Sequence, residues 1–368
     1  MKLKSEIAAT AIMGAFATVA ISLLSVGCSS VKIDEGTYPV GVMLPLSGED
    51  SEAAREVLRG MEMARDEINS SGGVSGVKMS LVLRDMAAKD FDFVDTFNAL
   101  RRSGVKVLNI GFDKEVILRH KAISGCDDIF VNYLCTYPPV TIGSKNSTRI
   151  FLNGAQQGDI MASAVDADQK GERQLVIMNV DNFYGKSNAD YLSFCLKTDK
   201  VKIYRDVFGS AEKDFDIFST QIKRLWAEYV FYVGNGATLP DFVSSLAKCG
   251  YDKAVVANCG FLNFNFVPPN SLELLRIETL FQQGKLKGEV SRRFAANYKM
   301  KYAKDASWMA ACGYDSIVLL ARAASKQRFN PASMRGFFSN MKCEGAMGSI
   351  EFDASADTTM QIELVRQK

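Results

Sequence analysis

The chain of 368 residues contains a single histidine, His120, and its eight cysteines include no C-x-x-C pair. Zinc sites usually combine several closely spaced cysteine and histidine ligands, so we expect no metal site. No serine or cysteine motif lies beside His120, in the segment EVILRHKAIS. The G-x-S-x-G, phosphate-loop and H-E-x-x-H patterns are also missing. These absences predict a protein that is not an enzyme and that has no cofactor.

The sequence also lacks a large net charge of either sign. The net charge is +2, from 44 Lys and Arg against 42 Asp and Glu, without a basic block. Proteins that bind nucleic acid usually carry a basic patch that neutralises phosphates, so nucleic acid is not an expected partner. The chain also lacks low-complexity tracts and short internal repeats. At this length a single core usually divides, so we expect two lobes.

The N-terminus differs from the rest of the chain. A lysine-containing start precedes an apolar run over residues 7–26, and the sequence GCSS follows directly. This order predicts a secretory signal peptide over residues 1–28 that ends at a lipidated Cys28, with residues 29–37 as a tether. A transmembrane anchor is the alternative, since the run is about long enough to span a bilayer. The lipoprotein interpretation places the protein in a bacterial cell envelope, on its periplasmic or extracellular face.

Seven further cysteines follow Cys28, and an odd number cannot pair completely. Their spacing suggests no disulfide framework, and connectivity cannot be deduced from a sequence. We therefore expect buried free thiols. The seven are Cys126, Cys135, Cys195, Cys249, Cys259, Cys312 and Cys343.

The most informative pattern spans residues 38–69. Residues 40–44 are almost continuously apolar, as expected for a parallel strand that is covered on both faces. A polar loop at Ser47 follows, and apolar residues spaced by three and four then predict a helix that Gly72 and Gly73 end. In open α/β sheets, ligands lie beyond the carboxyl ends of the strands, which would place Ser47 at a ligand cleft. The alternative is an ordinary turn without a ligand.

This unit resembles the first βα unit of type I periplasmic binding proteins, in particular the branched-chain amino acid receptor group. The resemblance covers about residues 38–366, and three further stretches agree with the family in order and spacing. They are MNVDNFYGKSNADYLSFCLK (178–197), AEYVFYVGNGATLPDFVSSLAKCGYDKAVVANCGF (227–261), and RRFAANYKMKYAKDASWMAACGYDSIVLLARAA with the later MGSIEFDASAD.

The resemblance implies an α/β fold with two doubly wound parallel-sheet lobes and a ligand cleft between them. Three crossings of the chain between the lobes would make each lobe discontinuous in sequence. Residues 38–157 plus 285–346 would form lobe 1, and residues 158–284 plus 347–368 would form lobe 2. The ligand would favour the closed form, because it shifts the equilibrium by its differential affinity for the two states.

Two strand ends of lobe 1 supply candidate ligand contacts. Where the family usually has a small serine-containing loop for the ligand carboxylate, this chain has the charged Asp113 and Lys114. Lys114 either replaces that contact by its charge or is solvated. At the next strand end, Thr136 matches the family and Cys135 replaces a small residue. Thr136 is the strongest candidate for binding a ligand oxygen, and the alternative is a threonine that caps its own turn.

Lobe 2 supplies the other candidates. Tyr184 in DNFYG matches a family tyrosine at a strand end, and its ring either closes over the ligand or packs as a hinge contact. Asn235 in FYVGNG is expected to read the ligand by hydrogen bonds. Amino acid receptors commonly carry an acid where this chain has Asn258 and Cys259. A desolvated ammonium without an anion costs several kcal/mol, so a zwitterionic ligand is disfavoured unless another carboxylate compensates.

Together these features predict the solute-binding lipoprotein of an ABC importer. Its ligand would be small and polar or amphipathic, namely amino-acid-like, an amide or a related compound. Its partners would be that ligand, the ABC permease, and the membrane through the lipid anchor. The alternative is a regulatory or scaffold lipoprotein of the envelope that reuses the fold to contact protein partners. An enzyme that uses His120 or a cysteine is the least favoured interpretation.

Overall fold

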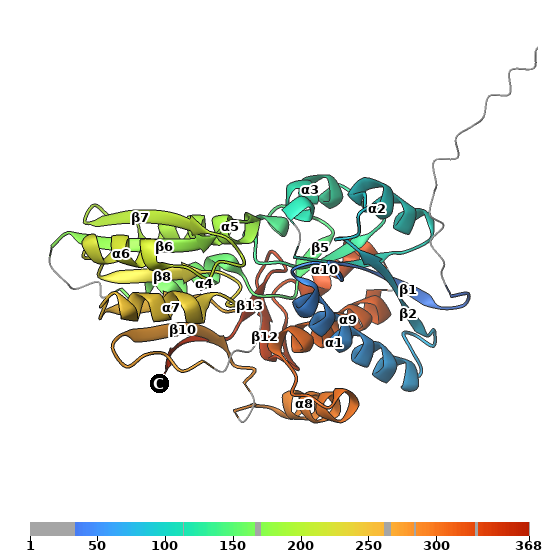
Figure 1. Cartoon of the computed structure of the whole chain (residues 1–368). Helices are drawn as coiled ribbons and strands as arrows, with labels where there is room; N and C mark the ends of the chain where they lie inside the picture. Colours follow the sequence, from blue (N-terminus) through green and yellow to red (C-terminus); the bar gives the residue numbers. More distant parts are fainter. Residues whose placement is uncertain are drawn as a thin grey trace, which may run out of the picture. The chain divides into compact units, whose positions relative to one another are not determined.

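A computed structural model shows how the chain folds, and Figure 1 traces its elements in order. Residues 31–368 form one compact unit, to which the following description applies. The predicted signal peptide and Cys28 lie outside the described residues. The structure describes residues 34–112, 114–165, 171–260, 266–282, 285–327 and 330–367.

The first sheet is parallel throughout, in the order β2-β1-β3-β4-β5. Val42 of β1, an inner strand of this sheet, packs in one core with Ala54, while its neighbour Met43 packs in another core with Phe93. Both faces of the strand are therefore covered, as its continuous apolar run predicts. The strands are β1 (Tyr38–Leu44), β2 (Met79–Asp85), β3 (Val107–Gly111), β4 (Phe130–Leu134) and β5 (Ser147–Arg149), and the connecting helices are α1 (Ser51–Ser70), α2 (Phe93–Arg102), α3 (Lys114–Ser124) and the short 3₁₀ helix η1 (Pro138–Val140).

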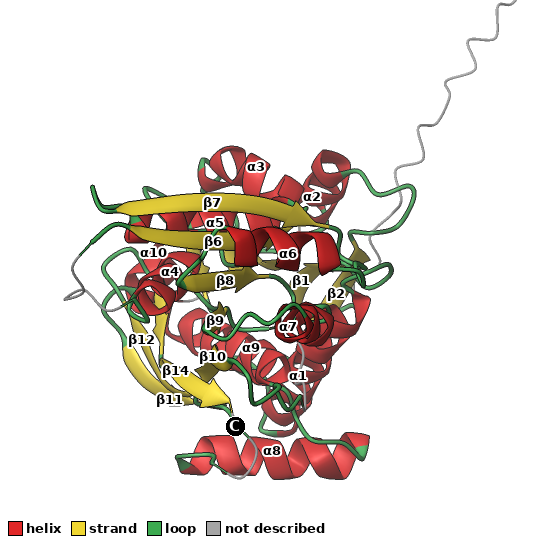
Figure 2. Cartoon of the chain, turned by 60° about the vertical axis from the view of Figure 1, so that its left-hand side comes forward, coloured by secondary structure: helices red, strands yellow, loops and turns green. Residues whose placement is uncertain are grey.

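The second sheet has the order β14-β10-β9-β8-β6-β7; β14 pairs antiparallel to β10, and the other pairs are parallel. Figure 2 shows β8, β6 and β7 side by side. Each of the two sheets, with its helices, forms an α/β lobe. The strands are β6 (Arg173–Val180), β7 (Val201–Phe208), β8 (Tyr229–Val233), β9 (Ala254–Ala257), β10 (Glu273–Thr279) and β14 (Ile362–Gln367), and the helices are α4 (Gly154–Ala162), α5 (Phe183–Leu196), α6 (Asp216–Arg224) and α7 (Leu239–Lys248).

A third, small sheet is antiparallel and has the order β11-β12-β13. It follows three helices in the chain and joins them to the last strand of the second sheet. The helices are α8 (Glu289–Tyr302), α9 (Trp308–Gln327) and α10 (Pro331–Phe338), and the strands are β11 (Lys342–Gly345), β12 (Gly348–Phe352) and β13 (Thr358–Met360).

Helices α1 and α9 lie against each other in both cartoon views (Figures 1 and 2). Two glycines make the approach close. A Cβ atom on Gly60 of α1 would lie 1.9 Å from the carbonyl oxygen of Ala310 on α9, and a Cβ atom on Gly313 would lie 2.0 Å from the carbonyl oxygen of Val57. The two backbones are thus in contact without side chains between them.

A buried ion pair joins β5 to the segment before β13. The Arg149 side chain is fully buried, and its guanidinium contacts both carboxylate oxygens of Asp357, with Nε 2.6 Å from Oδ1. Thr141 and Asn153 also donate hydrogen bonds to Asp357. Arg149 further donates to the carbonyl oxygen of Cys135, at 3.2 Å, and so fixes the loop that carries Thr136.

A second buried carboxylate anchors the turn between β11 and β12 to α9. Asp315 accepts hydrogen bonds from the backbone N–H groups of Ala346 (2.6 Å) and Met347 (2.8 Å). A Cβ atom on Gly345 would lie 2.6 Å from both carboxylate oxygens, so a glycine lets the turn approach the acid. Burial raises the pKa of Asp315 from 3.8 to about 7, against the lowering effect of the two amides.

This raised pKa predicts a pH dependence of stability. The folded protein holds the proton of Asp315 more tightly than the unfolded chain does. The stability gained from this proton is therefore complete below about pH 4 and is lost as the pH rises through about 7. Over that range the free energy of unfolding should fall by a few kcal/mol relative to that of Asp315→Asn. Urea unfolding of both proteins from pH 4 to pH 8 measures the difference. A difference that does not change with pH would mean that Asp315 titrates alike in both states.

The seven cysteines of the described region are all free, as predicted. The expectation that all of them are buried is wrong for four. Cys135, Cys259 and Cys312 are buried, whereas the other four are only partly buried; these are Cys126, Cys195, Cys249 and Cys343. No helix among the described residues combines the length and the apolar character that a membrane span requires.

Candidate functional site

The polar loop after β1 is held by the last residue of the neighbouring strand. The carboxylate of Asp85 accepts hydrogen bonds from the backbone N–H groups of Leu46 (2.9 Å) and Ser47 (3.3 Å). Although burial alone would raise its pKa, the hydrogen bonds from this loop lower the pKa of Asp85 overall. Ser47 is half-buried at the carboxyl end of β1. Its predicted contact with a ligand stays a prediction.

Thr136 and Cys135 follow β4 directly, and both are 5% exposed. The hydroxyl oxygen of Thr136 accepts a hydrogen bond from Nδ2 of Asn188 on α5, at 2.9 Å. Its carbonyl oxygen accepts the N–H of Gly154, the first residue of α4, at 2.7 Å. The loop of the first sheet therefore contacts the helices of the second. Burial raises the pKa of the Cys135 thiol to about 11, so this thiol is neutral at pH 7.

Tyr184 lies in the first turn of α5, where we had expected the end of a strand; β6 already ends at Val180. The reason is local, because the Asn182 side chain accepts the N–H of Gly185 and caps a helix that begins at residue 183. The hydroxyl of Tyr184 accepts a hydrogen bond from Nδ2 of Asn258, which follows β9. Burial raises the pKa of Tyr184 well above its usual value, so the phenol remains protonated.

Asn258 also ties two strand ends of the second sheet together, since its Oδ1 accepts the N–H of Gly234 at 3.1 Å. Its neighbour Cys259 is buried and donates its backbone N–H to Oε1 of Gln157 on α4, at 3.4 Å. Burial raises the pKa of the Cys259 thiol to about 12. Asn235, in contrast, uses its Oδ1 to accept the N–H of Ala237 in its own turn.

These contacts form a continuous chain, which we call the strand-end cluster. It runs from Thr136 through Asn188 to Tyr184, and on to Asn258 and the adjacent Cys259, which binds Gln157. Helix α4 then leads from Gln157 to Gly154, whose N–H binds Thr136. The structure thus brings together four of the predicted site residues, Cys135, Thr136, Tyr184 and Cys259. In the described region, the hydrogen bonds of Ser47 and Asn235 go to Asp85 and Ala237, which lie outside the cluster.

Two predicted contacts cannot be placed. Asp113 lies outside the described residues, and Lys114 begins α3 but its side chain is not described. His120 is buried further along α3, where its ring meets that of Tyr137 edge-on, with 6.1 Å between the centroids. Among the described residues, no group of three or more histidine, cysteine or acidic side chains is placed to hold a metal ion.

Sequence reasoning missed Gln157, Asn188 and Gly154. Each lies in a helix, whereas the sequence pattern predicts ligand contacts in the loops that follow the strands. One weak signal for this helix is present in the sequence. Asn153 caps α4 by accepting the N–H of Ala155, which marks a helix start that points toward the Thr136 loop.

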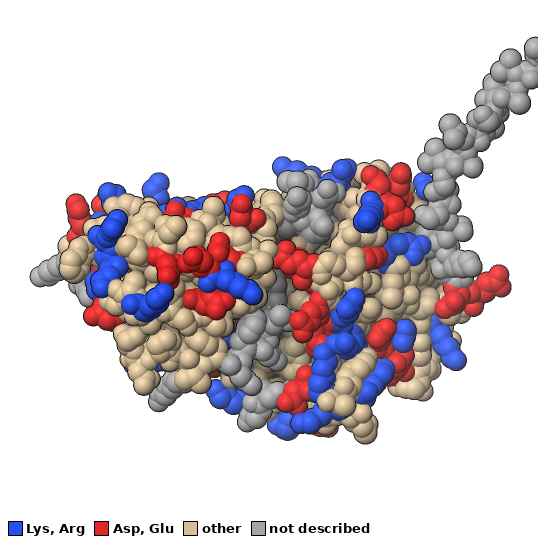
Figure 3. Space-filling model, viewed as in Figure 1, with Lys and Arg blue, Asp and Glu red and all other residues tan. Residues whose placement is uncertain are grey.

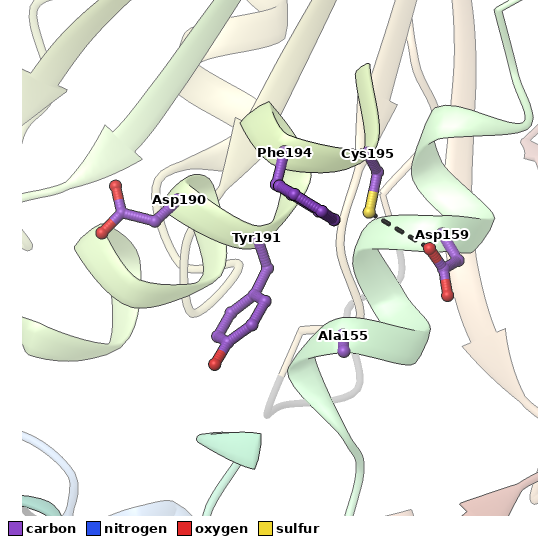
Figure 4. Close-up of a pocket in the computed structure, with 6 residues that line it drawn as sticks. All are labelled: Ala155, Asp159, Asp190, Tyr191, Phe194 and Cys195. Carbon is purple, nitrogen blue, oxygen red and sulfur yellow. Dashed lines mark hydrogen bonds between the residues drawn. The ribbon is translucent and has the colours of Figure 1, made fainter. Parts of the chain in front are cut away.

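A separate hollow lies on the outer side of α4 and α5, with a cavity volume of about 490 Å³ (Figure 4). The Phe194 ring is 80% exposed beside it, and Cys195 donates a hydrogen bond from Sγ to Asp159 across it, at 3.1 Å. Tyr191, Ala155 and Asp190 complete the lining. On the face shown in Figure 3, basic and acidic side chains are interspersed.

Comparison with known proteins identifies the family. The family model described as "Periplasmic binding protein" matches residues 37–364. A Leu/Ile/Val-binding protein homolog from Brucella melitensis is 25% identical over 230 residues, which is 62% of each chain and so less than two thirds of that relative. A second homolog, from Brucella abortus, is 25% identical over 339 residues, or 87% of each chain.

Solved structures agree on the fold. The substrate-binding protein LivJ of a Streptococcus pneumoniae branched-chain amino acid transporter, in complex with isoleucine, has a TM-score of 0.70 at 20% identity, over 90% of this chain and 99% of that one. A solute-binding protein of an ABC transporter from Rhodopseudomonas palustris, in complex with 3,4-dihydroxybenzoic acid, has a TM-score of 0.72 at 19% identity, over 90% and 93%. The family model and these relatives are described as binding proteins, in agreement with the prediction from the sequence that the chain is not an enzyme. The chain belongs to the type I periplasmic binding proteins of the branched-chain amino acid receptor family.

Proposed function

We propose that this chain is the solute-binding lipoprotein of an ABC importer and that it binds a small ligand between its two lobes. The observation that carries the proposal is the strand-end cluster, because its hydrogen bonds connect the carboxyl end of β4 in one sheet with that of β9 in the other. Ligands of open α/β folds bind at such strand ends. Closure of the two lobes around the ligand would complete the site.

The range of ligands in the proposal follows from the relatives and from the polar groups at the cluster. The relatives named above are Leu/Ile/Val-binding proteins or were solved with isoleucine or an aromatic acid. The cluster itself consists of hydroxyls, amides and protonated thiols. We therefore propose an amino-acid-like compound, an amide or an aromatic acid as the ligand, with a branched aliphatic or an aromatic tail.

The remaining parts of the proposal rest on the sequence and the family. Lipid anchoring at Cys28 follows from the signal-like N-terminus, and it places the protein outside the cytoplasmic membrane, next to its permease. The lobes are proposed as residues 38–157 plus 285–346 and residues 158–284 plus 347–368, with the first boundary inside α4, a helix that packs against α5 of the second lobe. Ser47, Asn235, Asp113 and Lys114 remain candidate ligand contacts.

The scaffold interpretation has one observation in its favour. Thr136 and Asn258 already form hydrogen bonds within the protein, so the cluster is partly satisfied without a ligand. In that case no small solute binds, and the fold contacts a protein of the envelope instead.

A thermal unfolding experiment distinguishes these functions. The purified chain is first freed of bound ligand by unfolding and refolding, and is then tested against amino acids, amides, aromatic acids and short peptides. At 100 times its Kd, a ligand should raise the Tm by about 5 °C. Thr136→Ala should abolish that rise, because the ligand loses a hydroxyl partner and Asn188 loses its acceptor.

A matched control is Thr220→Ala, the same change at an exposed residue of α6 that is hydrogen-bonded within its own helix. It should leave the Kd within twofold of wild type. A panel without any rise in Tm, together with a protein crosslinked to the chain in the envelope, would contradict solute binding and support the scaffold.

A further inference from the structure

Within the described part of the chain, two buried side chains of the strand-end cluster have polar atoms without a hydrogen-bond partner. Gln157 is 2% exposed; its Oε1 accepts the N–H of Cys259, and its Nε2 has no partner. Asn188 is 6% exposed; its Nδ2 donates to Thr136 and to the carbonyl oxygen of Tyr184, and its Oδ1 has no partner. Unpaired buried polar groups destabilise a folded protein and are rare, so two at one place require an explanation.

The two atoms lie close to the same stretch of α4. Gly154 and Gln157 are three residues apart and therefore share a face of this helix. A Cβ atom on Gly154 would lie 2.5 Å from Oδ1 of Asn188 and 2.8 Å from the carbonyl oxygen of Thr136. The free oxygen of Asn188 therefore lies beside Gly154 and the Thr136 loop, and Gln157 follows Gly154 one helical turn later on α4.

The ionisable groups next to the pair are neutral or paired, since Arg276 beside Cys259 forms an ion pair with Glu278. Burial raises the pKa of the Cys135 and Cys259 thiols to about 11 and about 12, so both are neutral at pH 7. The guanidinium of Arg149 reaches the carbonyl oxygen of Cys135 but is neutralised by Asp357. The site thus offers an uncharged N–H donor on Gln157 and an uncharged acceptor on Asn188.

We propose that Gln157 and Asn188 recognise an amide group of the ligand by hydrogen bonds. Nε2 of Gln157 donates to the amide carbonyl oxygen, and Oδ1 of Asn188 accepts the amide N–H. A carboxylate would place an oxygen against Oδ1, and an ammonium would offer Nε2 no acceptor. One amide group, which combines a carbonyl with an N–H, satisfies both atoms at once, whereas a carboxylate alone or an ammonium alone does not. The inference rests on the proposed solute-binding function and adds to it a ligand class and the residues that select it.

The inference is tested with three matched probes that have an aromatic tail and three that have a branched aliphatic tail. They are benzamide, N,N-dimethylbenzamide and benzoate, and 3-methylbutanamide, its N,N-dimethyl derivative and 3-methylbutanoate. Affinities are measured by calorimetry on the refolded full chain. For at least one tail, the primary amide should bind at least 10-fold more tightly than the other two probes.

Gln157→Glu provides the test on the protein side. It keeps the oxygen that accepts the N–H of Cys259 and replaces Nε2 by a second oxygen, so it should weaken amide binding at least 10-fold. Gln156→Glu is the matched control, because it adds the same charge one residue away, where Nε2 of Gln156 donates to Met360. This control should keep the amide affinity within threefold.

The possible outcomes distinguish a failure of the amide inference from a failure of the proposed solute-binding function. Tighter binding of a carboxylate or an amino acid than of every amide overturns the ligand class while solute binding stands. Amide binding that is unchanged in Gln157→Glu overturns the role of this residue and would indicate that water pairs with the two atoms. If no probe and no other solute binds the wild-type chain, the proposed function fails, and the inference fails with it.

Discussion

Replacing Gly313 by alanine is expected to lower the free energy of unfolding by about 3 kcal/mol. In an exposed helix this change is normally stabilising, since glycine is among the poorest helix formers. Here the new methyl group would lie 2.0 Å from the carbonyl oxygen of Val57. The obstacle is helix backbone, which cannot rotate away as a side chain can, so α1 and α9 must move apart and lose packing. Gly60→Ala should have a similar effect, because its methyl group would meet Ala310.

Gly336→Ala serves as the matched control in urea unfolding. Gly336 also lies within a helix, α10, but a Cβ atom there would have no heavy atom within 4 Å. Alanine should therefore stabilise the protein by about 0.5–1 kcal/mol. Equal effects at Gly313 and Gly336 would contradict the close approach of α1 and α9.

Asp357→Ala should cost about 3–5 kcal/mol of stability, the range found when one partner of a buried ion pair is removed. The substitution leaves the fully buried guanidinium of Arg149 without a carboxylate, and Thr141 and Asn153 lose their acceptor. Urea unfolding at pH 7 measures the loss. Since Arg149 also holds the carbonyl oxygen of Cys135, the variant should bind any identified ligand more weakly.

Two comparisons give this prediction its controls. Asp190→Ala removes the exposed pair with Arg205 and should cost less than about 1 kcal/mol. The double variant Arg149→Met/Asp357→Leu removes both charges, so it should recover part of the stability lost in Asp357→Ala. A double variant as unstable as the single one would mean that packing around these residues, rather than the unpaired charge, causes the loss.

Burial of the ion pair has a consequence for binding. The pair links β5 to residues before β13 that are 208 positions later in the chain, and the same guanidinium holds the loop of Thr136. The loop at the strand-end cluster is therefore positioned by a contact between distant segments. Substitutions at Arg149 and Asp357 are expected to alter affinity without touching the ligand.

The sequence alone determined the features that arise from local patterns. The apolar run of β1 and the amphipathic stripe of α1 follow from periodicity, which is a property of neighbouring residues. The strand ends at Ser47 and Thr136 follow from where such runs stop, and the order of the motifs indicates the family. These features need no knowledge of which segments meet.

The tertiary structure decided which of these residues act together. Gln157 and Asn188 lie within helices, and nothing in their neighbourhood in the sequence marks them. Their unpaired atoms arise because α4 and α5 meet the ends of strands from both sheets. Gly60 and Gly313, and likewise Arg149 and Asp357, are explained only by contacts between segments more than 200 residues apart. Such contacts depend on how the elements pack, and packing is a property of the whole chain that no local pattern contains.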